Sequence, residues 1–99
     1  KYQVKIDKAS SGADAIKMAQ EKEYDLILMD IEMPEINGLK ATQKIKALNK
    51  NIPIIAVTGN NSEEKLKEIL DAGFDNYFIK GDDYADLVKI IADCLLIFE

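Results

Sequence analysis

Three short apolar runs constrain the fold of this chain more than any other feature of its sequence. They cover Leu26 to Met29, Ile54 to Val57 and Tyr77 to Ile79. Each run is too short for a helix and is rich in apolar or β-branched residues, which predicts strands buried on both faces. A weaker run from Tyr2 to Ala9 alternates apolar and charged residues, and this pattern predicts an edge strand.

Helical periodicity follows or separates these runs. The last helix is predicted to begin at a cap formed by Asp82 or Asp83. Its inward face should carry Leu87, Ile90, Ile91, Cys94, Leu95 and Phe98. A shorter helix should begin at Asn61 or Ser62 and stop at Gly73. Its inward residues should be Leu66, Ile69 and Leu70.

Two further helices are predicted earlier in the chain. One should follow Gly12 and the other should follow Gly38. Their inward residues should be Ala13, Ile16 and Ala19 in the first, and Leu39, Ala41, Ile45 and Leu48 in the second. Strands that alternate with helices imply βαβ units, a parallel sheet and right-handed crossovers. We therefore expect one α/β domain over residues 1–99.

Polar residues close the three strongest runs. Asp30, Thr58 and Lys80 each follow one run directly. Ligands of an open α/β sheet bind beyond the carboxyl ends of the strands, so these side chains should face one rim. A single polar residue after a strand commonly starts a solvated loop. A carboxylate, a hydroxyl and an ammonium together suit phosphoryl transfer, with the carboxylate as nucleophile and the other two groups holding phosphoryl oxygens.

The overall composition excludes several other functions. The chain has 99 residues, a net charge of −5 and no histidine. Its scattered lysines argue against a nucleic-acid surface. One cysteine, Cys94, allows neither a disulfide framework nor a metal cluster, and we expect it to be a buried, inert thiol. No apolar run approaches the roughly 18 residues of a membrane span, so a cytoplasmic location is expected.

Three segments resemble receiver domains of two-component response regulators, especially those of hybrid sensor kinases. The stretch Tyr24 to Leu39, with Asp30-Ile31-Glu32-Met33-Pro34, resembles their third strand and the loop after it. Pro53 to Thr58 resembles their fourth strand, and Ala72 to Lys80 resembles their fifth. The resemblance implies a flavodoxin-like, doubly wound parallel sheet of strand order 2-1-3-4-5.

The resemblance also implies roles. Asp30 would be the phosphoacceptor, and Mg²⁺ would be held by Asp30 and by the backbone carbonyl of Glu32. Lys80 would pair with the phosphoryl group, and Glu32 and Asn60 would tune its hydrolysis. Thr58 would move toward the phosphoryl group. The donor would be a phosphohistidine on a histidine kinase or phosphotransfer protein, so the domain would be no enzyme beyond self-catalysed phosphotransfer and autodephosphorylation.

Tyr77 would be the second half of the switch that Thr58 starts. Its ring would swing inward and change the surface made by the last strand and helix, which is the family's common output or dimer face. An aromatic residue in a strand is more often plain core, so Tyr77 also has a purely structural interpretation.

Two departures from the family pattern stand out. The expected first strand, with its acidic pair, and the first helix are missing from this sequence. Three explanations are open: the two elements lie outside the given sequence, a second chain supplies them, or Tyr2 to Asp7 takes the central place in a shortened domain with Asp7 as a lone acidic ligand. The family also usually has proline after the lysine, where this chain has Gly81. A cis bond before a non-proline residue costs about 3 kcal/mol, so the Lys80-Gly81 bond should be trans.

Two other functions compete with a phosphorylatable switch. A pseudo-receiver would have the same fold and bind proteins without taking phosphate. A small phosphatase-like hydrolase would use Asp30 and Glu32 as paired carboxylates. The second is disfavoured because Met33-Pro34 follows directly and no second domain is present to close over a substrate.

Overall fold

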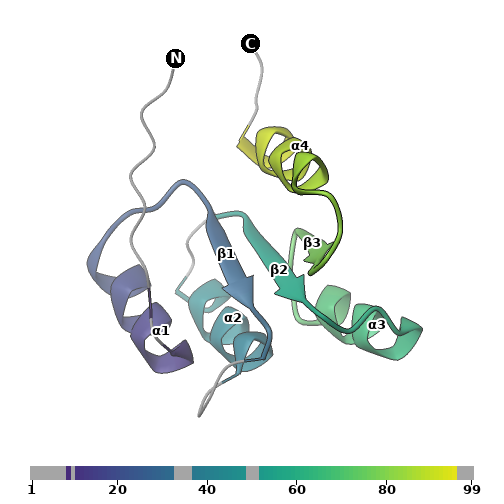
Figure 1. Cartoon of the computed structure of the whole chain (residues 1–99). Coiled ribbons are helices and arrows are strands. Elements are labelled where there is room, and N and C mark those ends of the chain that lie inside the picture. Colours follow the sequence, from purple (N-terminus) through teal and green to yellow (C-terminus); the bar gives the residue numbers. More distant parts are fainter. Residues whose placement is uncertain (1–8, 10, 33–36, 49–51, 96–99) are drawn as a thin grey trace.

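A three-stranded parallel sheet forms the centre of the structure (Figure 1). The computed structural model describes residues 9, 11–32, 37–48 and 52–95. The elements follow in the order α1 (Gly12–Glu21), β1 (Ile27–Asp30), α2 (Gly38–Lys46), β2 (Ile54–Thr58), α3 (Glu63–Asp71), β3 (Asn76–Ile79) and α4 (Tyr84–Leu95). The predicted alternation of strands and helices is confirmed. The predicted edge strand lies outside the described residues except for Ala9, which is exposed and not in a strand.

The register of the sheet brings the strand ends to one edge. β2 is the middle strand, with Asp30 of β1 opposite Val57 and with Thr58 opposite Ile79 of β3. All three strands run in parallel, so their carboxyl ends share this edge. The residues that follow the strands are therefore neighbours in space, as their sequence positions predicted.

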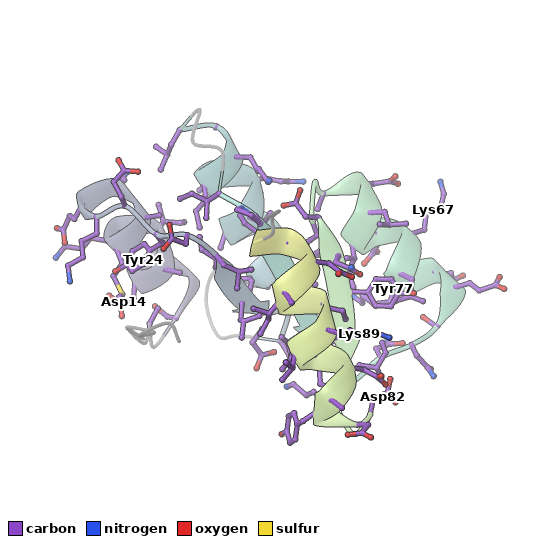
Figure 2. All side chains as sticks on the ribbon, turned by 90° about the horizontal axis from the view of Figure 1, so that it is seen from above. Asp14, Tyr24, Lys67, Tyr77, Asp82 and Lys89 are labelled. Atoms are coloured by element: carbon purple, nitrogen blue, oxygen red, sulfur yellow. The ribbon has the colours of Figure 1, made fainter. Side chains whose placement is uncertain are left out.

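The helices cover the two faces of the sheet unequally. Figure 2 shows α4 on the side of the sheet opposite to α2 and α3. The main core lies on the α1 to α3 side, where alternate strand residues meet the inner faces of these helices. Its buried members are Ala19, Met29, Ile31, Ala41, Ile45, Ile54, Ala56, Ile69 and Phe74.

The α4 face has a smaller apolar layer. Ile55 is fully buried and Phe78 nearly so. The ring of Phe78 stacks on the ring of Tyr84 at the start of α4, with 6.0 Å between centroids. Leu28 of β1 is 46% exposed on this face. In the described part of the chain, β1 pairs with β2 alone.

Side-chain caps begin the helices as the sequence predicted. The Ser62 hydroxyl accepts a hydrogen bond from the Lys65 amide at 3.2 Å, and the Asp83 carboxylate accepts one from Ala85 at 3.0 Å. Each cap satisfies an amide that has no partner within the helix. Gly73 ends the turn after α3 with a φ of +102°, a conformation that favours glycine.

Three predictions of burial need correction. Ala13 and Leu70 were expected to face inward, but both are exposed, Leu70 by 58%. Each follows a buried residue, Gly12 or Ile69, and one helical step turns its side chain away from the sheet. Cys94 is half-buried rather than buried.

The half-burial of Cys94 nevertheless supports an unreactive thiol. Desolvation, followed by the nearby charges of Asp75 and Asp93, raises the pKa of this thiol above its ordinary value. Because the thiolate is the nucleophile, a raised pKa lowers reactivity.

The expected inward positions Leu95 and Phe98 lie outside the described side chains. Among the described helices, none combines the length and the apolar content of a membrane span.

Candidate functional site

The carboxyl edge of the sheet carries the polar residues singled out in the sequence. Asp30 is the last residue of β1, Thr58 is the last of β2, and Lys80 follows β3. The Lys80 side chain reaches past the end of the middle strand to Asp30. Its Nζ donates to Oδ2 of Asp30 at 3.1 Å and to Oδ1 at 3.3 Å. The ammonium and the predicted nucleophile are thus in direct contact.

Glu32 connects this ion pair to Thr58. Its backbone amide donates to Oδ1 of Asp30 at 3.0 Å. Its Oε2 accepts a hydrogen bond from the Thr58 hydroxyl at 3.1 Å, and its Oε1 lies 3.9 Å from Nζ of Lys80. The four side chains therefore form one continuous polar network at the edge of the sheet.

Thr58 is the buried member of the network. Its residue has no exposed surface, and its Oγ1 also accepts a hydrogen bond from the Asn60 amide at 3.0 Å. The side-chain oxygen of Asn60 accepts from the Ser62 amide at 2.9 Å, at the start of α3. Asn60 thus shapes the loop after β2, and its predicted role in hydrolysis stays a prediction.

The residue after β1 is hydrogen-bonded to both β2 and the start of α2. Ile31 donates its amide to the carbonyl of Val57 at 3.0 Å, and the carbonyl of Ile31 accepts from the Gly38 amide at 3.1 Å. A β-carbon on Gly38 would meet the Asp30 carbonyl oxygen and would lie 2.9 Å from the Ile31 α-carbon. Only glycine allows α2 to approach the backbone of the predicted phosphoacceptor this closely.

The site is accessible and carries excess negative charge. The side chains of Asp30, Glu32 and Lys80 are each between two-fifths and about half exposed. Two carboxylates face a single ammonium. An incoming phosphoryl group would add further negative charge, so a cation would make its approach more favourable.

The described residues offer few oxygen donors for magnesium, so most ligands of a bound ion would have to be water or phosphate oxygens. The described residues contain no cluster of three or more His, Cys, Asp or Glu that could hold a metal together. The Asp30 carboxylate and the Glu32 carbonyl are two oxygen donors. Magnesium is commonly held by one or two carboxylates and completes its octahedron with water and phosphate oxygens.

Tyr77 and Gly81 lie at the β3 side of the site. Tyr77 is partly buried and packs against the main core, and Figure 2 shows it on the side of the sheet toward α3. Among the described peptide bonds none is cis, so the predicted trans Lys80-Gly81 bond is confirmed. Gly81 has a φ of +98°, which the ring of proline cannot adopt. The departure from the family pattern thus has a local backbone reason.

Sequence reasoning missed two features of the site. The contact between Glu32 and Thr58 joins residues 26 positions apart, and it depends on the register between β1 and β2. The close packing of Gly38 depends on the angle at which α2 meets the sheet. Asn37-Gly38 could be read from the sequence only as a turn.

The sequence matches one family over nearly its whole length. Residues 1–92 match the family model described as "Response regulator receiver domain". The chain is 37% identical over 89 residues to the chemotaxis protein CheY of Halobacterium salinarum, which covers 90% of this chain and 74% of that protein. It is 37% identical over 90 residues to the CAI-1 autoinducer sensor kinase/phosphatase CqsS of Vibrio cholerae, covering 88% of this chain.

Solved structures give the same result. The receiver domain of the sensor histidine kinase PA1611 of Pseudomonas aeruginosa aligns with a TM-score of 0.80 and 32% identity, over 88% of this chain and 73% of that domain. That crystal structure holds a magnesium ion in its active-site cleft. A two-component response regulator of Clostridium difficile aligns with a TM-score of 0.83 and 27% identity, over 90% of this chain and 73% of its own.

Several of the matched proteins are much longer than the chain. It spans 13% of CqsS, and the same share of two-component system protein A of Emericella nidulans, to which it is 36% identical over 89 residues.

Proposed function

This chain belongs to the response regulator receiver domain family, with its flavodoxin-like α/β fold, and on that premise we propose that Asp30 accepts a phosphoryl group from a phosphohistidine of a partner protein. The observation that carries the proposal is the contact of Lys80 with both carboxylate oxygens of Asp30. An ammonium in this position can pair with the Asp30 carboxylate before the transfer and with the acyl phosphate after it. The chain has no histidine of its own to serve as donor.

The transfer would proceed on the exposed side of the Asp30 carboxylate. One carboxylate oxygen attacks phosphorus, the bond between phosphorus and the donor imidazole nitrogen breaks, and that nitrogen keeps the electron pair. Lys80 stays beside the new acyl phosphate and balances part of its charge. Thr58 supplies a neutral hydroxyl at the same rim. The side chains therefore contribute mainly position and charge.

Magnesium is the proposed cofactor. It would be held by the Asp30 carboxylate and the Glu32 backbone carbonyl, with water and phosphoryl oxygens completing its shell. When bound, it supplies the positive charge that the excess of carboxylates lacks. The ion in the active-site cleft of the PA1611 receiver domain supports this proposal.

The proposed output couples Thr58 to Tyr77. A shift of the Thr58 hydroxyl toward the phosphoryl group would open space beside β2, and the ring of Tyr77 would move into it. This movement would alter the surface of β3 and α4, where an output partner or a second copy could bind. Histidine kinases or phosphotransfer proteins are the proposed donors, and the cytoplasm is the proposed location. Glu32 and Asn60 are the residues proposed to set the lifetime of the acyl phosphate.

An intact-mass experiment tests the proposal. The full-length protein is incubated with a small acyl phosphate and Mg²⁺, and one added phosphoryl group is expected. Asp30→Asn should abolish this adduct, whereas Asp82→Asn, which changes an exposed carboxylate in the loop after β3, should retain it. A chelator should also abolish it. An adduct that survives in Asp30→Asn would refute the assignment, and no adduct in the unmodified protein would favour a pseudo-receiver.

A further inference from the structure

We infer that the Glu32 carboxylate is an internal ligand of the phosphoryl pocket, which it occupies until a phosphoryl group displaces it. This inference rests on the proposed function of Asp30. It goes further because it gives Glu32 a role before phosphorylation, as a competitor for the groups that the phosphoryl oxygens need.

The contacts of Glu32 match those expected of a phosphoryl group. One carboxylate oxygen holds the Thr58 hydroxyl at 3.1 Å, and the other lies 3.9 Å from the Lys80 ammonium. A carboxylate, like a phosphoryl group, presents several acceptor oxygens with negative charge. Glu32 therefore spans both groups that are proposed to receive phosphoryl oxygens.

The hydroxyl of Thr58 cannot serve two acceptors. A hydroxyl has one proton to donate, and that of Thr58 is donated to Glu32. The oxygen of Thr58 accepts from the Asn60 amide, and the residue is fully buried while Glu32 is in this position. A phosphoryl oxygen can therefore gain the Thr58 proton only after Glu32 has left.

The remainder of Glu32 is arranged for such a departure. Its backbone is held by the 3.0 Å bond from its amide to Asp30, while its side chain is about half exposed. The side chain can thus swing into solvent while the backbone stays in place. Phosphorylation would convert the singly charged Asp30 carboxylate into an acyl phosphate of nearly two negative charges, which would repel the Glu32 carboxylate more strongly. Entry of the phosphoryl group and release of Thr58 would then be one coupled event.

Two variants of Glu32 separate occupancy from simple charge repulsion. Glu32→Ala removes both the charge and the contact. Glu32→Asp keeps the charge but is one methylene shorter, so it should not reach the Thr58 hydroxyl. Glu21→Ala is the matched control, because Glu21 is exposed at the end of α1, away from the site. The full-length protein is treated with a small acyl phosphate and Mg²⁺, and the rate of adduct formation is followed by intact mass.

If Glu32 occupies the phosphoryl pocket, both Glu32 variants should form the adduct faster than the unmodified protein. Loss of one charge-assisted hydrogen bond should accelerate adduct formation about tenfold, to a similar extent in Glu32→Ala and Glu32→Asp, with Glu21→Ala unchanged. Affinity for beryllofluoride with Mg²⁺, measured by titration, should likewise rise in both Glu32 variants and stay unchanged in Glu21→Ala. This second readout involves no chemical step.

The possible failures are distinguishable. If all forms react at the same rate, Glu32 does not occupy the pocket, and the role of Asp30 stands. The same conclusion follows if Glu32→Ala reacts faster while Glu32→Asp keeps the rate of the unmodified protein. If no form gains a phosphoryl group, the proposed function is wrong and this inference with it. If only the Glu32 variants react, the internal ligand acts as a complete block, and the lack of an adduct in the unmodified protein then no longer favours a pseudo-receiver.

Discussion

Substitution of Lys80 should change the rate of phosphorylation much more than the stability of the protein. Its ion pair with Asp30 is about half exposed, and such pairs contribute at most about 1 kcal/mol to folding. Lys80→Met should therefore change the free energy of unfolding in urea by less than about 1 kcal/mol. Loss of the positioned cation should slow adduct formation by about a hundredfold or more.

A matched lysine controls for the lost charge. Lys67 pairs with Asp71 at 3.8 Å on the exposed side of α3, away from the site. Lys67→Met should leave both the unfolding free energy and the rate of phosphorylation nearly unchanged. A Lys80→Met protein that reacts at the normal rate would mean that the contact with Asp30 has no part in the transfer.

Two fully buried threonines should respond in opposite ways to removal of their hydroxyl. Within the described residues, Oγ1 of Thr42 has no hydrogen-bond partner, whereas Oγ1 of Thr58 has two. Thr42→Val removes an unsatisfied polar atom and should be neutral or stabilise the protein by up to about 1 kcal/mol. Thr58→Val leaves the Asn60 amide unpaired and should destabilise it by about 1–3 kcal/mol. Urea unfolding measures both, and equal effects would contradict the hydrogen-bond assignments.

The sequence predicted the residues of the site better than their contacts. Asp30, Thr58 and Lys80 could be found because each directly follows an apolar run, and parallel strands bring such positions to one edge. The bond between Glu32 and Thr58 could not be found, because it depends on strand register and on a side-chain rotamer in the loop after β1.

At the scale of elements, the packing of α2 against β1 should be sensitive to one methyl group. Alanine has a higher helix propensity than glycine, but the new β-carbon of Gly38→Ala would clash with the backbone of Asp30 and Ile31. We expect a net destabilisation of about 1–3 kcal/mol and slower phosphorylation. Gly59→Ala is the control for stability, since a β-carbon there meets nothing within 4 Å. Equal unfolding free energies for the two variants would show that α2 can shift without cost.

Asp75 should stabilise the edge of the sheet where the strands begin, opposite to the site. Its carboxylate accepts from the Ile54 amide at 2.8 Å and from Nζ of Lys46 at 3.1 Å, so it ties the start of β2 to α2. Asp75→Ala should destabilise the protein by about 2 kcal/mol, because hydrogen bonds to a charged group are lost. Asp71→Ala removes only an exposed pair and should cost less than about 0.5 kcal/mol. Similar urea midpoints for the two variants would contradict this role.

Element types were predictable from periodicity, while inward faces were predictable only in part. The runs that precede Asp30 and Thr58 became strands within a residue of the predicted bounds. Leu70 was predicted to face the core because it belongs to the apolar face of its helix. Ile69 is the residue that is buried there, and the apolar face extends beyond the part that packs on the sheet.

For the whole molecule, the order of strands followed from the sequence more readily than the place of α4. Right-handed crossovers put α2 and α3 on the same face, because each connects neighbouring parallel strands that advance in one direction. No described strand follows α4, so this rule does not assign it a face. Its position opposite α2 and α3 had to come from the structure (Figure 2).

Asp30 is proposed to be the one residue of the chain that takes the phosphoryl group. The most direct measurement is to phosphorylate the full-length protein, reduce the acyl phosphate with borohydride and locate the resulting alcohol by peptide mass spectrometry. We expect residue 30 alone to be converted to homoserine. Reduction at Glu32 or at another carboxylate, with residue 30 intact, would contradict it.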